Sequence, residues 1–202
     1  MPGGWSDDDD APSPELVGAN VRRQARLVVR LVRISTRVDE PFTVTPALLC
    51  GLHRVAMEGI LPSAGRYRPD GEAYVGGHVP PSFDQVPGLV EEMCNYISEH
   101  WQASGPVQLA AYALWRTCWI HPFVDGNGRT ARAFSYLVLS TRSGFVLPGR
   151  HPIPDRIKQS RANMKEYYAA LGAADAAWRR GVLDVHVLAS VLSRHFIDQV
   201  TG

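Results

Sequence analysis

The sequence has no paired cysteines, no metal-binding histidine motif and no excess of either charge. Its three cysteines, Cys50, Cys94 and Cys118, are far apart and form no CxxC pair, so neither a disulfide framework nor a zinc knuckle is predicted. None of the seven histidines belongs to an HExxH pattern, which argues against a metal hydrolase. Lys and Arg number 21 against 20 Asp and Glu, so binding to nucleic acid or membrane would need a local patch of charge.

The chain also lacks a long apolar segment. No run approaches the roughly 20 residues needed to span a bilayer. Residues 1–10 are acidic, whereas a signal peptide begins with basic and then apolar residues. We therefore expect no membrane association and a cytoplasmic protein, unless another machine delivers it to another cell. Few, dispersed cysteines fit the reducing cytosol.

Residues 1–14 differ from the rest of the chain. They contain the acidic run Asp7–Asp10 and three prolines, and we expect a disordered acidic lead there. The whole chain is 45% hydrophobic and 20% charged, as in ordinary globular proteins. Residues 15–202 are enough for one domain with a core.

Apolar residues recur at helical spacing through most of this domain. Thr45 and Pro46 fit as the N-cap and first residue of one helix. We expect helices at residues 15–38, after Pro46, and at 84–101, 106–120, 131–139, 154–171 and 183–200. Residues 62–82 are instead rich in Pro, Gly and aromatic residues, with turn signals that favour a short hairpin or loop. The predicted fold is all-α, a helical bundle with one small β-hairpin.

The run HPFVDGNGRTAR, residues 121–132, lies between two of these helices. Its centre approaches the N-terminus of the second helix, where unpaired N–H groups and the helix dipole form an anion site. Gly126 and Gly128 permit positive φ and close approach of a ligand to the backbone. Asn127 can donate an amide N–H to a phosphate oxygen.

Charged residues of the same run complete a phosphoryl-transfer site. Asp125 is a hard oxygen donor suited to a Mg²⁺ ion that shares phosphate oxygens. Arg129 and Arg132 share a helix face, and their planar guanidinium groups suit a polyphosphate. His121 can be neutral near pH 7 and could take a proton from an attacking hydroxyl. Phe123 is predicted to be a buried anchor for the loop.

Each of these features alone has an ordinary explanation. A His before Pro often just ends a helix, Gly-Asn-Gly is often a plain turn, and paired arginines are usually solvated. Eight positions are specified together, however. At roughly 5% usage each, a chance match is on the order of 10⁻¹⁰ per starting position.

The run resembles the signature of Fic proteins, His-x-Phe-x-Asp/Glu-Gly-Asn-Gly-Arg-x-x-Arg, at every specified position. Residues 52–54, followed by residues 64–68, resemble the helix leading into the Fic "flap", and residues 74–81 resemble the flap and its exit. Residues 167–171 look like the segment that closes over adenine in many members. The similarity covers residues 15–200 and is closest to the AMP-transferring branch.

The resemblance implies a protein adenylyltransferase that uses Mg²⁺ and ATP to modify a Tyr, Thr or Ser hydroxyl of a protein substrate. His121 would be the general base, and Asp125 would hold Mg²⁺. The catalytic residues would be His121, Asn127 and Arg129, and the nucleotide would contact Gly126, Asn127, Gly128, Arg129, Arg132 and Tyr168. The flap residues Tyr74, Val75, Gly76, Gly77 and His78 would dock the target as an added strand.

Other activities on this fold stay open. A branch that phosphorylates its target has Lys where Gly128 stands, which argues against that chemistry here. Removal of AMP, phosphocholine transfer, transfer of other nucleotides and a non-catalytic nucleotide-binding role are alternatives. A helical nucleic-acid-binding protein is a further one, but it leaves the 121–132 run unexplained.

Regulation is the least specified property. Many Fic proteins carry an inhibitory helix with the pattern Ser/Thr-x-x-x-Glu-Gly/Asn, whose Glu would pair here with Arg132. The nearest match is Thr36 to Glu40, but Pro41 follows where Gly or Asn is expected. We therefore expect inhibition by a separate antitoxin-like protein, or none. The sequence predicts no particular oligomeric state.

A stripe of arginines is not explained by the family. It consists of Arg22, Arg26, Arg30, Arg33 and Arg37, which recur at steps of four, four, three and four. They should lie on one face of the first helix, opposite Leu27, Leu31 and Ile34. The stripe is either a solvated face or a docking surface for an acidic partner or a nucleic-acid backbone.

Overall fold

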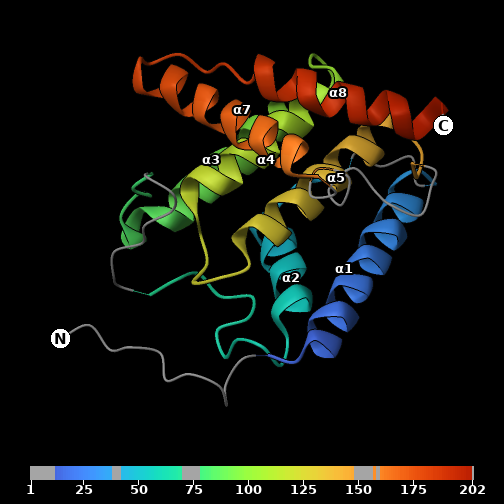
Figure 1. The fold of residues 1–202 in the computed structure, drawn as a ribbon, viewed down its shortest axis with the longest axis vertical. Helices are drawn as coiled ribbons and strands as arrows, with labels where there is room; N and C mark the ends of the chain where they lie inside the picture. Colours follow the sequence, from blue (N-terminus) through green and yellow to red (C-terminus); the bar gives the residue numbers. More distant parts are fainter. Residues whose placement is uncertain (1–11, 38–41, 70–77, 148–156, 158–159, 202) are drawn as a thin grey trace.

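The computed structural model describes residues 12–37, 42–69, 78–147, 157 and 160–201. This described part is helical, with His78 as a single β-bridge residue (Figure 1). Its elements are α1 (Pro14–Ser35), α2 (Pro46–Met57), the short 3₁₀ helix η1 (Phe83–Gln85), α3 (Val86–Glu99), α4 (Pro106–Ile120), α5 (Asn127–Ser143), α7 (Arg161–Arg179) and α8 (His186–Thr201).

Local sequence sets several helix starts. The hydroxyls of Ser13, Thr45 and Ser160 accept hydrogen bonds from backbone N–H groups in the first turns of α1, α2 and α7. Proline follows in the first turn of α1 and α2, where its missing N–H costs nothing. Each helix in the described part of the chain is either too short or too polar to span a bilayer.

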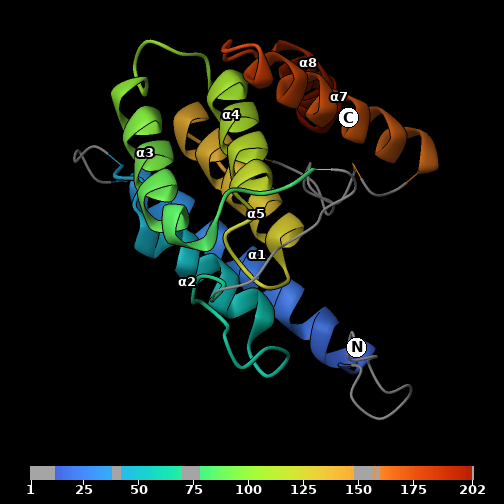
Figure 2. The same ribbon diagram turned by 90° about the vertical axis from the view of Figure 1, so that its left-hand side faces the viewer.

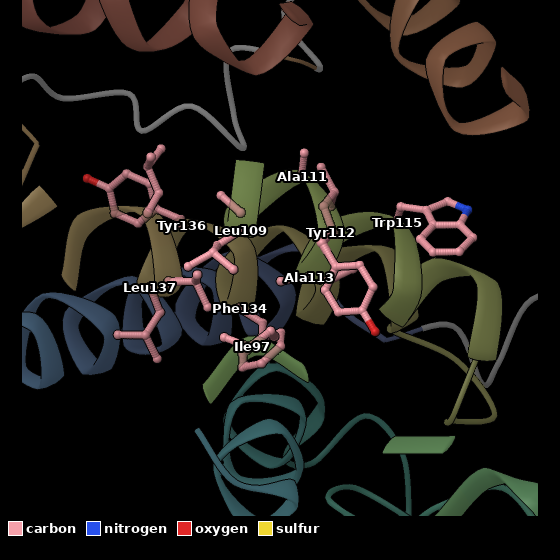
Figure 3. Packing of buried hydrophobic residues seen from close by; sticks show 14 of the residues in the cluster. Ile97, Leu109, Ala111, Tyr112, Ala113, Trp115, Phe134, Tyr136 and Leu137 are labelled. Atoms are coloured by element: carbon pink, nitrogen blue, oxygen red, sulfur yellow. The ribbon is translucent and has the colours of Figure 1, made fainter. Parts of the chain in front are cut away.

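The two helices that flank the 121–132 run form the centre of the bundle. α4 and α5 have the most extensive contact in the molecule, with α1 and α2 packed on one side and α7 and α8 on the other (Figure 2). Figure 3 shows Leu109 and Ala113 of α4 facing Phe134 and Leu137 of α5, all of them fully buried or nearly so. Because the run joins two core helices, its ends are fixed by the core.

The predicted helices are confirmed, with differences at their ends. The fifth begins at Asn127 rather than 131, because Gly126 adopts a left-handed φ and caps it. The sixth begins at Arg161 and continues past the predicted end at Leu171 to Arg179. Gly172 does not interrupt it, since the alanine-rich stretch that follows favours helix. The last begins at His186.

The segment predicted as a hairpin is described only in part. Residues 62–65 form turns, and His78 forms one β-bridge. The flap residues Tyr74, Val75, Gly76 and Gly77 lie outside the described residues, as does most of the acidic lead.

Arg22, Arg26, Arg30 and Arg33 lie on the exposed face of α1, as predicted, whereas Arg37 lies in the turn after the helix and is also exposed. The buried face differs from the expected one. It carries Asn20, Gln24, Val28 and Val32, whereas Ile34 is 50% exposed. The two amides are satisfied by backbone carbonyls of the neighbouring helix region: Asn20 Nδ2 donates to Glu58 O at 2.7 Å and Gln24 Nε2 to Leu52 O at 3.0 Å. Apolar periodicity alone could not identify this face, because half of it is polar.

Candidate active site

The loop between α4 and α5 begins and ends with a left-handed residue. His121 has φ 50° and ψ 60° and ends α4, while its N–H donates to Thr117 O at 3.1 Å. Gly126 has φ 75° and starts α5. His121 is the only non-glycine residue with positive φ in the described part of the chain. Such a conformation is uncommon outside glycine and asparagine and requires a surrounding structure that holds it.

Asn127 closes this loop with two hydrogen bonds. Its Nδ2 donates to Phe123 O at 2.7 Å, and its Oδ1 accepts from Phe123 N–H at 2.9 Å. Asn127 is 3% exposed and Phe123 is fully buried, which confirms the predicted anchor. The Asn127 acceptor and one of its donor hydrogens hold the loop, because a buried amide and a buried backbone must satisfy each other. Phosphate binding by this amide stays a prediction, and it would use the second donor hydrogen.

His53, on α2, also holds this loop in place, through contacts with Phe123 and Asp125. Its ring stacks on that of Phe123, with centroids 3.7 Å apart and planes 1° from parallel. Nδ1 accepts a hydrogen bond from Gly65 N–H at 2.8 Å, and Nε2 lies 2.9 Å from Asp125 O. Since Nδ1 is an acceptor, Nε2 must carry the proton, and the ring is neutral. Burial is the main cause that lowers the pKa of His53, which keeps this form.

Arg68 holds the other side of His121. Its Nε donates to His121 O at 2.9 Å, its backbone N–H donates to Pro122 O at 2.8 Å, and its Nη2 donates to Pro81 O. Neither Arg68 nor His53 was predicted as a site residue. The sequence signal for His53 was its place on the apolar face of α2, between Leu49 and Ala56 at helical spacing.

The two glycines of the run act differently. At Gly126 an added Cβ would lie 2.6 Å from Met57 Sδ and 3.3 Å from His53 Nε2, so both its φ and its surroundings require glycine. Gly128 lies inside α5 and has no positive φ, contrary to our expectation. A Cβ there would lie 3.1 Å from Arg132 Nη1, so its small size leaves room for that guanidinium group.

A cavity of about 590 Å³ opens beside the loop. Its volume is within the range of roughly 300–1,000 Å³ common for small-molecule sites. The cavity is lined by α4, the loop, the start of α5, α7 and His78, through the residues Trp115, Cys118, Trp119, His121, Asn127, Gly128, Arg132, Tyr167, Tyr168, Leu171, Gly172 and Asp175. It therefore brings together His121, Asn127, Gly128, Arg132 and Tyr168 of the predicted site.

Three described residues of the predicted site lie outside the cavity lining. Asp125 is exposed on the loop, Gly126 is buried beneath it, and Arg129 Nη1 lies 3.3 Å from Met57 Sδ. Arg129 and Arg132 therefore point to different surroundings in this structure. His78 is the described part of the predicted flap, and its Nε2 lies 2.8 Å from Trp119 O, on the rim of the cavity.

The environment of His121 favours its neutral form. Burial is the largest cause that lowers its pKa, and the nearby Arg68 and His78 lower it further, whereas the Cys118 backbone and Asp125 raise it. In the neutral form one ring nitrogen carries no proton, so His121 can serve as a proton acceptor at neutral pH.

Residues 43–139 match the sequence profile of the Fic/DOC family, which covers α2 to α5 and the loop between α4 and α5. The chain contains a Fic/DOC family domain. Protein adenylyltransferase Fic of Drosophila persimilis is 34% identical over 113 residues, 55% of this chain and 22% of that protein. Its counterpart in Drosophila virilis is equally similar, with 23% of its length covered. The chain thus spans about a fifth of the length of these curated relatives.

Solved structures extend the likeness of the Fic domain to nearly the whole chain. Fic-1 (residues 134–508) of Caenorhabditis elegans has a TM-score of 0.71 at 21% identity, covering 96% of this chain and 52% of that one. A Fic-domain signalling protein of Bacteroides thetaiotaomicron has a TM-score of 0.68 at 18% identity, covering 96% and 75%. At these identities the comparison establishes the fold, including α1, α7 and α8 outside the profile match.

The Fic domain offers one place suited to Mg²⁺. Within the described residues, no three His, Cys, Asp or Glu side chains form a metal cluster. Mg²⁺ that binds nucleotide phosphates does not need one, since it keeps several waters and takes one or two carboxylates. Asp125 is an exposed carboxylate two residues before Asn127, where α5 begins, so its chemistry fits this type of ion.

Replacing Gly126 with Ala tests the close approach of the loop to α2. Gly144 is the matched control, because its φ is 81° but nothing lies within 4 Å of an added Cβ. Gly144→Ala should cost about 1–2 kcal/mol of the free energy of unfolding, from its left-handed backbone. Gly126→Ala should cost about 1–3 kcal/mol more, because Met57 and His53 are buried and cannot move freely. Urea unfolding measures both, and equal losses would contradict the packing described here.

Proposed function

We propose that the chain is a protein adenylyltransferase, which transfers AMP from ATP to a Tyr, Thr or Ser hydroxyl of a target protein. The observation that carries the proposal is the cavity that joins His121 and the N-terminus of α5 to an aromatic wall of Trp119 and Tyr168. One end provides a base and anion donors, and the other end suits a nucleobase. The name of the Drosophila relatives supports the same activity.

In the proposed reaction, the target hydroxyl oxygen attacks the α-phosphorus of ATP. The hydroxyl proton passes to the free ring nitrogen of His121, the bond between the α-phosphorus and the bridging oxygen breaks, and pyrophosphate leaves. The products are a phosphodiester between AMP and the protein, and pyrophosphate. The neutral form of His121 that burial favours suits this role.

Other residues of the run would stabilise charge on the phosphates. The N–H groups of Gly126, which caps α5, and of Asn127 and Gly128 in its first turn have no intrahelical partner. Arg132 would bind the terminal phosphates from the cavity wall. Arg129 would turn from Met57 toward the leaving group. Bound at Asp125, Mg²⁺ would neutralise charge on the α- and β-phosphates.

We propose that target proteins dock along the segment that includes His78, and that the Fic domain occupies residues 15–202. Regulation would come from a separate antitoxin-like protein, because Pro41 departs from the inhibitory pattern. The candidate residue Glu40 lies outside the described residues. The three free thiols, Cys50, Cys94 and Cys118, fit a cytoplasmic site of action, including that of a cell to which the protein is delivered.

Incubation with Mg²⁺ and α-labelled ATP, alone and with a cell lysate, tests the activity. We expect a labelled protein with the added mass of AMP, and a rate lower by about 10²–10⁴-fold for His121→Ala, which removes the base. His186→Ala is the matched control, since His186 is exposed on α8. Absence of label with any nucleoside triphosphate, while ATP binds, would contradict the proposal. Equal label with His121→Ala would contradict the role of the base.

We further propose that an acidic protein partner docks on the arginine stripe of α1. Its five arginines are exposed, and within the described residues none of them forms an ion pair with a carboxylate. Arg23, which lies beside the stripe, does pair with Glu58. As far as the structure describes the chain, four of these charges on α1 and that of Arg37 just after it are therefore available to an anionic partner.

The double change Arg26→Gln and Arg30→Gln tests this docking surface. A fluorescent peptide of alternating Glu and Asp should bind several-fold more weakly to this variant at low salt, and binding to the unchanged protein should weaken with added salt. Arg179→Gln with Arg180→Gln, on the exposed end of α7, is the control and should bind like the unchanged protein. Equal affinity of all three proteins at low salt would refute the docking surface, and preference for a DNA duplex over the peptide would reassign it to nucleic acid.

A further inference from the structure

Asp175 supplies the only carboxylate among the described residues that line the cavity. It lies on α7, and neither the family signature nor the proposed reaction uses it. Asp175 is half-buried beside the aromatic residues Trp115, Trp119 and Tyr168 of this lining, so a ligand in the cavity would meet its carboxylate. The position of Asp175 and its hydrogen bonding indicate which group of a ligand would contact the carboxylate.

One end of the cavity lies at the N-terminus of α5 and suits phosphates, and it is formed by His121, Asn127 and Gly128. The opposite end contains Asp175. Trp115 lies six residues before His121 on α4, or about 9 Å along the axis. Asp175 is hydrogen-bonded to Trp115. A nucleotide with its phosphates at the loop would therefore place its base toward Asp175.

One oxygen of Asp175 is already engaged. Trp115 Nε1 donates to Oδ1 at 2.8 Å, and Trp115 itself is 1% exposed. Within the described part of the chain, no group donates a hydrogen bond to Oδ2, and no cation pairs with it. The indole thus orients the carboxylate and leaves one acceptor for a ligand. In Figure 3 Trp115 lies at the edge of the core group, apart from Phe134 and Leu137.

The wall beside Asp175 is held rigidly. The Arg116 guanidinium group lies 4.5 Å from the ring centroid of Trp119 and 4.7 Å from that of Trp178. Arg116 is 4% exposed and has Glu92 at 3.8 Å. This cation between two indoles fixes Trp119, whose ring lines the cavity and offers a surface on which a base can stack.

We propose that Asp175 selects the nucleobase by accepting a hydrogen bond from the exocyclic 6-amino group of adenine. This inference rests on the proposed nucleotide-transfer function. A carboxylate oxygen only accepts, so it favours the amino group and disfavours a base with a carbonyl at that position. Guanine pairs best with both oxygens of a carboxylate through N1–H and N2–H, and here one oxygen is held by Trp115. The single free oxygen matches the single amino group of adenine.

The test compares ATP with purine riboside 5′-triphosphate, which lacks only the 6-amino group. Asp175→Asn keeps an oxygen for the Trp115 indole and replaces the free acceptor with a donor NH₂. The unchanged protein should bind ATP at least about tenfold more tightly than the analogue, as for a hydrogen bond to a charged group. In Asp175→Asn this preference should disappear, because the NH₂ group of the asparagine would face the 6-amino group of adenine and both are hydrogen-bond donors. Isothermal titration with Mg²⁺ measures the four affinities, and intact mass confirms that no transfer occurs meanwhile.

Asp198→Asn, an exposed carboxylate on α8, is the matched control and should keep the tenfold preference. If ATP binds and is transferred but Asp175→Asn leaves the preference unchanged, base selection by Asp175 is wrong and the proposed function stands. If Asp175→Asn weakens the binding of ATP and of the analogue equally but leaves the affinity for 2′-deoxyATP unchanged, Asp175 binds the ribose and the inference is overturned. If the unchanged protein binds neither triphosphate, the proposed function fails as well.

Discussion

The geometry of the site depends on one buried contact, the ring of His53 stacked on the ring of Phe123. Phe123 can lie at the bottom of the loop only because a flat, neutral ring from α2 covers it. The same histidine binds Gly65 N–H through one nitrogen and Asp125 O through the other. A single side chain therefore positions the loop that precedes the flap segment and the loop that carries the motif. Because the His53 ring is neutral, it adds no charge next to the anion site at the N-terminus of α5.

The remaining features of the loop follow from this contact. Once Phe123 is buried, its backbone N–H and C=O must find partners, and the Asn127 side chain provides both. Gly126 must be glycine because the loop then passes directly over Met57 and His53. His121 is held in a left-handed conformation at the end of α4, with Arg68 bonded to its carbonyl. The loop is thereby preorganised, so nucleotide binding would not need to order it.

Prediction from the sequence was best where local chemistry decides. The sequence alone was sufficient to identify the helix periodicity, the cap at Thr45 and the motif at 121–132. The helical bundle and its domain family were predicted from these features. Prediction was weaker where tertiary contacts decide. Gly128 resembled a turn glycine but lies within a helix, and the buried amides of Asn20 and Gln24 concealed the inner face of α1.

Distant pairs could not be found from the sequence at all. Fifty-three residues separate Arg68 from His121, and sixty separate Trp115 from Asp175. Nothing local in either segment signals these hydrogen bonds, because each group is an ordinary polar residue until the fold brings its partner near. Asn127 was identified as a site residue, yet only the structure gave it the role of closing the loop.

The most direct test of this account is ¹⁵N NMR of the His53 ring, assigned by comparison with His53→Gln. The account predicts a neutral ring protonated at Nε2, with an unprotonated Nδ1. This form should persist below the pH at which an ordinary histidine takes up a proton, since burial lowers the pKa of His53. A ring protonated at Nδ1, or an imidazolium at neutral pH, would contradict it, because Gly65 N–H would then have no acceptor.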